Sequence, residues 1–157
     1  LSRRQRQMCK ETVPSVVDIQ INGWKSAYKG IIDDNVLNSM NRDERIKKEK
    51  HCKENGFIVA ELNNQVVGFC RYIDSNKFTQ DISYIDCELL ALYVKPDLKY
   101  NGIGTMLFQF VTNQFKSKNK TKMILWCLKD NEPSKKFYTK MGGKIVKERV
   151  IEIGENN

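Results

Sequence analysis

One stretch of the chain decides its fold class: Leu92-Tyr93-Val94-Lys95-Pro96-Asp97-Leu98-Lys99-Tyr100-Asn101-Gly102-Ile103-Gly104-Thr105. It leaves an apolar run, crosses a polar loop with two glycines and enters a helix. Glycine lets a ligand approach the backbone without a Cβ in the way, and the first N–H groups of a helix point into the loop, so the stretch suits a diphosphate. Alone it is a weak signal. It is neither a P-loop nor a dinucleotide fingerprint, because it lacks Lys-Ser or Lys-Thr after the second glycine and has no third glycine.

Strands and helices alternate on both sides of this stretch. Apolar periodicity predicts a long strand over residues 82–94, an amphipathic helix over 103–115, a strand over 123–128, a helix over 133–141 and a strand over 144–153. Upstream, the sequence predicts a helix from Thr12, a charged helix from Arg42 toward Gly56, and a β-hairpin of residues 57–62 and 65–72 around Asn63-Asn64. The order favours an α/β fold, a mixed sheet with helices on both faces.

A second stretch carries a polar stripe: Asn131-Glu132-Pro133-Ser134-Lys135-Lys136-Phe137-Tyr138-Thr139-Lys140-Met141-Gly142-Gly143. On a helix its Asn, Ser and Tyr side chains lie within an arc of about 60°, beside an apolar stripe. Standing alone, the pattern is typical of an ordinary capped helix with one half-buried tyrosine.

Composition narrows the class of protein. The 157 residues, 40% of them apolar, predict a single domain over 1–157. The balance of 27 Lys and Arg against 19 Asp and Glu gives +8, which favours an anionic partner. A nucleic acid is disfavoured, because no aromatic residues interleave the basic run of residues 42–53 for base stacking. That run, which holds Glu49 and the single histidine His51, is expected to be a solvated helix face.

The cysteines and the apolar runs indicate a compartment. The five cysteines, at positions 9, 52, 70, 87 and 127, contain no CxxC pair, which favours free thiols in a reducing cytoplasm. With one histidine and no such pair, we expect no metal site. The longest apolar run, residues 89–94, is far shorter than the roughly 20 residues that span a bilayer, so no membrane segment is expected.

Together, the two stretches resemble the GNAT superfamily of acyl-CoA-dependent N-acyltransferases. The resemblance rests on the pattern Arg/Gln-x-x-Gly-x-Gly/Ala and on the later Asn…Phe-Tyr…Gly-Gly run; Trp24-Lys25-Ser26-Ala27-Tyr28-Lys29-Gly30-Ile31 is also similar to a common opening of the family. It implies the GNAT fold, with a mostly antiparallel sheet of six to seven strands. In this fold the central strands splay apart and form the cleft for acetyl-CoA.

The resemblance also implies which residues bind the cofactor. Leu92, Tyr93 and Val94 would hydrogen-bond the pantetheine arm, and the segment from Lys99 to Thr105 would wrap the pyrophosphate. The residues of that segment are Lys99, Tyr100, Asn101, Gly102, Ile103, Gly104 and Thr105. Lys99 departs from the family's Arg or Gln, keeping the positive charge but losing the planar fork. Asn131 and Ser134 match positions that touch the lower pantetheine arm or the acceptor side.

Two residues are implied as catalytic. Tyr138 matches the tyrosine that protonates the departing thiolate. Glu88 is similar in location to catalytic glutamates of some family members; strand alternation would place it on one face with Leu90, Leu92 and Val94. Two interpretations of Glu88 stay open: a cleft carboxylate that deprotonates an amine, or an exposed residue at a strand start.

The implied activity is transfer of an acetyl group from acetyl-CoA to a primary amine of a small molecule or a peptide. By family analogy Trp24, Tyr28 and Asp33 would flank the acceptor entrance, or serve only packing and a turn. The alternative is a module that binds acyl-CoA without turnover. The family usually adds a strand after residues 144–153, whereas the sequence stops at Asn157. We therefore expect either a missing terminal segment or pairing with a neighbouring chain in a homodimer.

Overall fold

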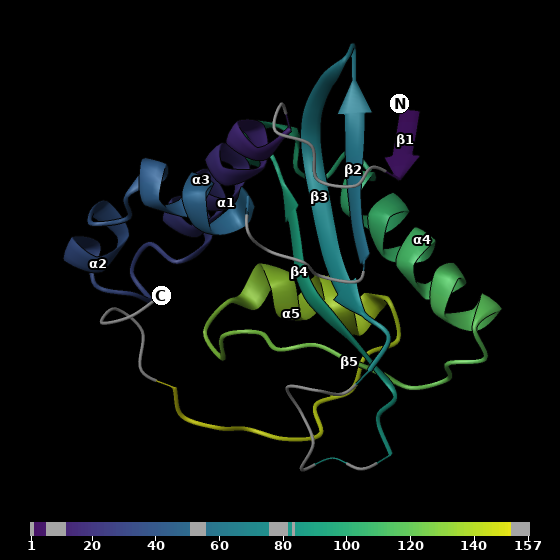
Figure 1. The fold of residues 1–157 in the computed structure, drawn as a ribbon. Coiled ribbons are helices and arrows are strands. Elements are labelled where there is room, and N and C mark those ends of the chain that lie inside the picture. Colours follow the sequence, from purple (N-terminus) through teal and green to yellow (C-terminus); the bar gives the residue numbers. More distant parts are fainter. Residues whose placement is uncertain (1, 6–11, 51–55, 76–81, 83, 152–157) are drawn as a thin grey trace. The chain divides into compact units, whose positions relative to one another are not determined.

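The computed structural model describes residues 2–5, 12–50, 56–75, 82 and 84–151 (Figure 1). They form two compact units, described separately: unit 1 is Leu1–Gly23 with Asn41–Leu125, and unit 2 is Trp24–Met40 with Trp126–Asn157. The interpretation of His51 as a solvated residue lies outside the described residues. In chain order the elements are β1 (Ser2–Gln5), α1 (Val13–Ala27), α2 (Asp34–Asn38), α3 (Arg42–Lys50), β2 (Gly56–Leu62), β3 (Gln65–Ile73), β4 (Cys87–Val94), a 3₁₀ turn (Pro96–Leu98), α4 (Ile103–Ser117), β5 (Met123–Ile124) and α5 (Glu132–Lys140).

The described strands form one five-stranded sheet in the order β1-β2-β3-β4-β5 (Figure 1). The first three pairings are antiparallel and β4–β5 is parallel. The predicted α/β class with a mixed, mostly antiparallel sheet is confirmed, whereas the described residues supply five strands rather than the expected six to seven. β1 was not predicted, because its sequence SRRQ has no apolar alternation and joins the sheet through its backbone.

The predicted β-hairpin of β2 and β3 is confirmed. Asn63 and Asn64 form its turn with φ of 51° and 60°. A two-residue turn with both central residues in the left-handed region matches the twist of the strands, and Asn tolerates that region better than most residues. The turn therefore sets the register of the two strands.

The two faces of the sheet pack against different helices. On one face, called the α1 face below, Val16 and Ile19 of α1 form a buried cluster with Phe57, Val59 and Phe69. Strand pairing places Phe57 opposite Arg71 and Val59 opposite Phe69, so these side chains share this face. These residues form an apolar core between α1 and the sheet.

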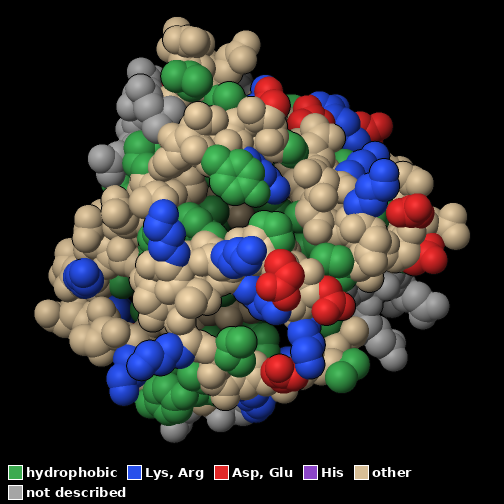
Figure 2. Space-filling view, turned by 180° about the vertical axis from the view of Figure 1, so that it is seen from behind, with side chains coloured by type: hydrophobic (Ala, Val, Ile, Leu, Met, Phe, Trp, Pro, Cys, Tyr) green, Lys and Arg blue, Asp and Glu red, His purple; other side chains and the backbone are tan. Residues whose placement is uncertain are grey.

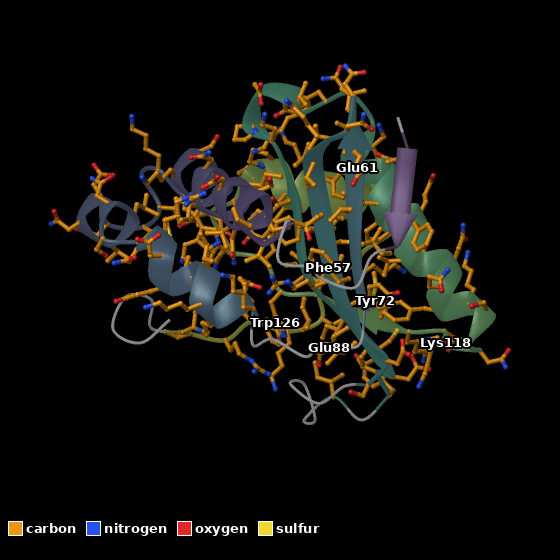
Figure 3. All side chains as sticks on the ribbon, turned by 45° about the horizontal axis from the view of Figure 1, so that its top comes forward. Phe57, Glu61, Tyr72, Glu88, Lys118 and Trp126 are labelled. Atoms are coloured by element: carbon orange, nitrogen blue, oxygen red, sulfur yellow. The ribbon has the colours of Figure 1, made fainter. Side chains whose placement is uncertain are left out.

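Helix α4 covers the opposite face, called the α4 face. A Cβ on Gly68 would lie 2.9 Å from the Tyr93 carbonyl oxygen and 3.2 Å from Leu107, so only glycine allows α4 to approach so closely. At the other end of the helix the rings of Phe115 and Tyr72 meet edge to face at 5.3 Å. Lys118, which caps this end, pairs with Asp74 (Figure 3). Helices on both faces of the sheet are thus confirmed.

Three predicted strands are shorter than expected, or absent. The strand predicted over 82–94 begins only at Cys87, because the Ile85 N–H turns back to the Ile82 carbonyl. The strand predicted over 123–128 ends at Ile124. Residues 144–151, the described part of the strand predicted over 144–153, belong to no strand. Within the described segments, none of these apolar residues is paired to a neighbouring strand.

The start of β5 is held by a carboxylate. The N–H groups of Thr121 and Lys122 donate to Asp86 over 3.4 Å and 3.3 Å. Burial favours the protonated form of Asp86, but these donors outweigh it and hold the pKa of the side chain below its ordinary value. Asp86 thereby fixes β5 next to the first residues of β4.

Helix α3 is attached by charged groups. Outside, Arg42 forms a bidentate pair with Asp18 of α1, at 2.6 Å and 3.1 Å. Inside, Glu49 pairs with Arg71 of β3, and both side chains are over 90% buried. The prediction that the charged run is a solvated face is therefore wrong for Glu49, the one buried residue of α3.

Candidate functional site

The ladder between β4 and β5 ends early. It joins two residue pairs, Cys87 with Met123 and Glu88 with Ile124. From there β4 continues to Val94, so the predicted pantetheine contacts Leu92, Tyr93 and Val94 lie beyond the ladder. All three side chains are half-buried. An extended ligand can bind such a strand edge as an additional strand, through main-chain hydrogen bonds.

A β-bulge interrupts β4 beside this edge. Tyr72 of β3 pairs with Leu89, whereas Arg71 pairs with Ala91, which leaves Leu90 without an opposite residue. Glu88, opposite Ile73, therefore shares the α1 face with Ala91 and Tyr93. The predicted grouping of Glu88 with Leu92 and Val94 is wrong, because those two residues lie on the α4 face.

Glu88 is a buried acidic residue of unit 1 (Figure 3). It is 2% exposed, and among the described residues its Oε1 finds no hydrogen-bond donor. The interpretation of Glu88 as an exposed residue at a strand start is therefore wrong. Because a buried carboxylate oxygen without a hydrogen bond is costly, this oxygen is a candidate to contact a ligand.

The predicted pyrophosphate loop follows β4 through Pro96, which ends the strand as expected. The Asn101 side chain holds the loop together by donating to the carbonyl oxygens of Leu98 and Lys99, over 3.1 Å and 3.2 Å. The Asn101 side-chain amide therefore forms its hydrogen bonds with the backbone of the loop. Lys99 is half-buried, and Tyr100 is almost fully exposed.

The loop ends at the first turn of α4. Gly102 caps this helix with φ of +79°, has no side-chain capping bond, and has open space where a Cβ would stand. Ile103, the first residue of α4, is buried, while Gly104 and Thr105 are half-buried in the same turn. The first N–H groups of a helix lack intrahelical partners and favour anions. With Lys99 nearby in sequence, this donor set fits a diphosphate.

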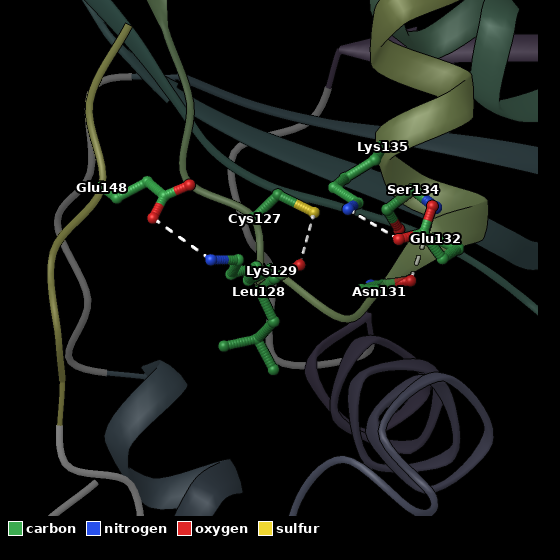
Figure 4. Close-up of polar contacts among 8 residues, drawn as sticks. All are labelled: Cys127, Leu128, Lys129, Asn131, Glu132, Ser134, Lys135 and Glu148. Atoms are coloured by element: carbon green, nitrogen blue, oxygen red, sulfur yellow. Dashed lines mark hydrogen bonds and ion pairs between the residues drawn. The ribbon is translucent and has the colours of Figure 1, made fainter. Parts of the chain in front are cut away.

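Three predicted site residues of unit 2 belong to helix α5 or its N-cap, and two of them, Asn131 and Ser134, are shown in Figure 4. Asn131, 4% exposed, caps the helix by accepting the Ser134 N–H at 3.4 Å. The Asn131 side chain thus caps the helix, as expected if the polar stripe belongs to an ordinary capped helix. Tyr138 is half-buried, and its ring meets that of Phe137 edge to face at 5.2 Å.

The predicted acceptor-side residues also belong to unit 2. The rings of Trp24 and Tyr28 meet edge to face at 5.1 Å. Asp33 is exposed and caps α2 by accepting the Asn35 N–H at 2.8 Å. Packing and helix capping thus account for these three residues locally, and their role toward an acceptor stays a prediction.

Other features of the described residues bear on ligands. A cavity of about 730 Å³ opens beside α1, the β2–β3 turn and residues 95–97, and none of the predicted site residues lines it.

No group of three or more His, Cys, Asp or Glu in the described segments is arranged to hold a metal ion. None of the described helices is long and apolar enough to cross a membrane. On the face shown in Figure 2, Lys and Arg side chains are spread over the surface, whereas Asp and Glu side chains lie in the centre and toward the right of the view.

Comparison with known proteins decides the family. The sequence matches the Acetyltransferase (GNAT) family over residues 24–143, well over half of the chain. The chain belongs to the GNAT family. As a member it is an N-acetyltransferase that uses acetyl-CoA as its acetyl donor.

Relatives and solved structures agree with this membership. Spermidine N(1)-acetyltransferase of Thermoplasma acidophilum is 26% identical over 147 residues, which cover 89% of this chain and 87% of that protein. The crystal structure of the PaiA N-acetyltransferase from T. acidophilum in complex with coenzyme A superposes with a TM-score of 0.75 at 23% identity, covering 95% and 94% of the two chains. The aminoglycoside antibiotic 6′-N-acetyltransferase from Acinetobacter haemolyticus gives a TM-score of 0.73 at 12% identity over both whole chains. These structures share the GNAT fold.

Proposed function

We propose that this GNAT enzyme transfers the acetyl group of acetyl-CoA directly to a primary amine of a small molecule or a peptide. The observation that supports the proposal best is Glu88, a buried carboxylate with an unpartnered oxygen beside the bulge of β4. Glu88 takes a proton from the amine nitrogen, directly or through water, so that the nitrogen lone pair can attack the thioester carbonyl.

The remaining steps use backbone and phenol groups. As the C–N bond forms, a backbone N–H of Leu92–Val94 stabilises the negative charge on the carbonyl oxygen. As the C–S bond breaks, Tyr138 donates its phenolic proton to the sulfur, and the resulting phenolate takes the remaining extra proton from the nitrogen. The products are the N-acetylated amine and CoA with a free thiol. Lys99 and the first-turn amides of α4 hold the diphosphate of CoA, while Asn131 and Ser134 line the path of its lower arm.

We propose polyamines as the first acceptors to test, because a relative of similar length is named spermidine N(1)-acetyltransferase. Trp24, Tyr28 and Asp33 would meet the cationic chain of such an amine through aromatic faces and a carboxylate. The panel also includes aminoglycosides, amino acids and peptide N-termini, which the sequence leaves open.

Replacing Glu88 with Gln is expected to lower kcat/KM for the preferred amine by about 100-fold, because Gln keeps the shape and cannot accept the proton. The measurement is release of the CoA thiol over the amine panel. Glu61→Gln is the matched control, since Glu61 is also a buried carboxylate of the same sheet, 5% exposed. If Glu88→Gln turns over like the wild type, Glu88 is not the base. If the wild type releases no thiol with any amine, the chain is a module that binds acyl-CoA without turnover.

Two further properties are proposed. A single domain of 157 residues is supported by the family match, which runs through both units. A cytoplasmic location is supported by Cys70, Cys87 and Cys127, which are free thiols, as expected in a reducing compartment.

We also propose a homodimer formed through residues 144–151. Ile145, Val146, Val150 and Ile151 are all more than half exposed, and the segment has no strand partner in the described part of the chain. Exposed aliphatic residues in an extended segment favour pairing with a second copy. Light scattering is expected to give a dimer mass for the wild type and a monomer mass for Val150→Asp. A monomeric wild type at high concentration would count against the dimer.

A further inference from the structure

Tyr100 has an unusual backbone and an unusual side chain. Its φ is +67°, in the left-handed region. The other non-glycine residues with positive φ in the described segments are Asn63, Asn64 and Asn119. Asn tolerates this region through its short polar side chain, whereas a bulky residue there is strained. Such strain persists only where something else compensates for it.

The Tyr100 side chain contributes nothing to that compensation through contacts of its own. The Tyr100 side chain is 94% exposed, and no ring contact or ion pair within the described segments involves it. Other groups secure the loop conformation: the Asn101 side-chain amide donates to two carbonyl oxygens, and Ile103 at the start of α4 is buried. A glycine at position 100 would thus satisfy the backbone better, and a fully exposed aromatic ring contributes no burial.

We infer that Tyr100 stacks on the adenine ring of CoA and thereby selects the complete cofactor over donors that lack the nucleoside. The inference rests on the proposed function, because it requires that the loop from Lys99 to Thr105 holds the diphosphate. In CoA the adenosine is joined directly to that diphosphate. A flat aromatic ring displayed one residue from Lys99 is therefore within reach of the base.

Adenine is the part of the cofactor whose chemistry matches this side chain. Every nucleobase offers a π face, and stacking on a Tyr ring buries apolar surface on both partners without requiring a particular hydrogen bond. The pantetheine arm offers no such face, and phosphate groups would select a cation rather than a phenol. Stacking thus explains why an aromatic residue occupies a position that favours glycine.

The test is calorimetric binding of CoA and of 4′-phosphopantetheine, which lacks the nucleoside, to the full chain. Tyr100→Gly is expected to raise the Kd for CoA by about 5- to 30-fold and to leave that for 4′-phosphopantetheine within about twofold. Tyr100→Phe keeps the ring and is expected to bind CoA within about twofold of the wild type. The urea midpoint of Tyr100→Gly should equal or exceed that of the wild type, because glycine relieves the positive φ. Asn119→Gly is the matched backbone control.

Several outcomes would overturn the inference. Wild-type affinity of Tyr100→Gly for CoA would show that the ring does not touch the base, and equal weakening for both ligands would assign Tyr100 to loop shape alone. The variant Gly102→Val tests separately whether the loop from Lys99 to Thr105 binds the diphosphate. Its control is Gly30→Val, because Gly30 has a similar φ of +80° and also lies in open space. If Gly102→Val binds CoA like the wild type, the loop assignment fails and the inference with it. If Gly102→Val is weakened and Tyr100→Gly is not, this inference alone fails.

Discussion

Replacing Tyr138 with Phe is expected to lower kcat by about 10- to 1,000-fold while the affinity for CoA stays within about twofold of the wild type. An alkyl thiolate is a poor leaving group, so a proton delivered as the C–S bond breaks lowers the barrier. The hydroxyl is the only group removed by the change. The ring and its edge-to-face contact with Phe137 are kept.

The measurement is steady-state release of CoA thiol with the preferred amine, paired with calorimetric titration of CoA. The backbone of Tyr138 accepts the Gly143 N–H at 2.9 Å where α5 ends, and the substitution leaves that bond in place. A loss of kcat therefore reports the hydroxyl and not the helix. Tyr84→Phe is the control, because Tyr84 is 55% exposed and lies outside the proposed site. An unchanged kcat in Tyr138→Phe would remove Tyr138 from the mechanism.

Local signals in the sequence are sufficient for several elements. The hairpin follows from Asn63-Asn64, since few residue pairs accept two successive left-handed conformations. Pro96 ends β4 because proline has no N–H for the ladder. Helix α4 follows from its apolar stripe, whose residues Leu107, Val111 and Phe115 are buried as predicted.

The structure differs from the sequence-based predictions mainly where the conformation of a segment depends on backbone that is distant in the sequence. Nothing in the residues around Leu90 marks a bulge, yet the bulge moves Glu88 to the α1 face. Residues 144–151 alternate like a strand, but alternation becomes a ladder only beside another backbone. The strain at Tyr100 is equally invisible in composition, because the sequence shows an ordinary tyrosine where the loop requires a positive φ.

Glu49 is the clearest case in which charge pattern misleads. Its neighbours in the sequence are lysines, so the run indicates a solvated helix, and only the fold shows that Glu49 meets Arg71 of β3. The Arg71 guanidinium also lies over the rings of Phe57 and Phe69, at 5.8 Å and 5.7 Å. A long-range partner thus changes the role of a residue that looks like surface.

Replacing Glu49 with Ala is accordingly expected to lower the free energy of unfolding by about 3 to 5 kcal/mol, because the Arg71 charge would stay buried without its carboxylate. Urea unfolding followed by circular dichroism measures the change. Asp18→Ala is the control: it removes the ion pair between α3 and α1, and since that pair is exposed, the urea midpoint should stay close to the wild type.

A second variant separates the cost of the unpaired charge from the cost of a cavity. In Glu49→Gln with Arg71→Met, both charges are gone and most of the volume is kept, so most of the lost stability is expected to return. A Glu49→Ala variant as stable as the wild type would mean that Arg71 finds another counterion.

Arg71 pairs in the sheet with Ala91, next to the bulge and on the face of Glu88. We therefore expect Glu49→Ala to lower acetyl transfer as well, through loosening of this part of β4, whereas the charge-free double variant should recover both stability and turnover.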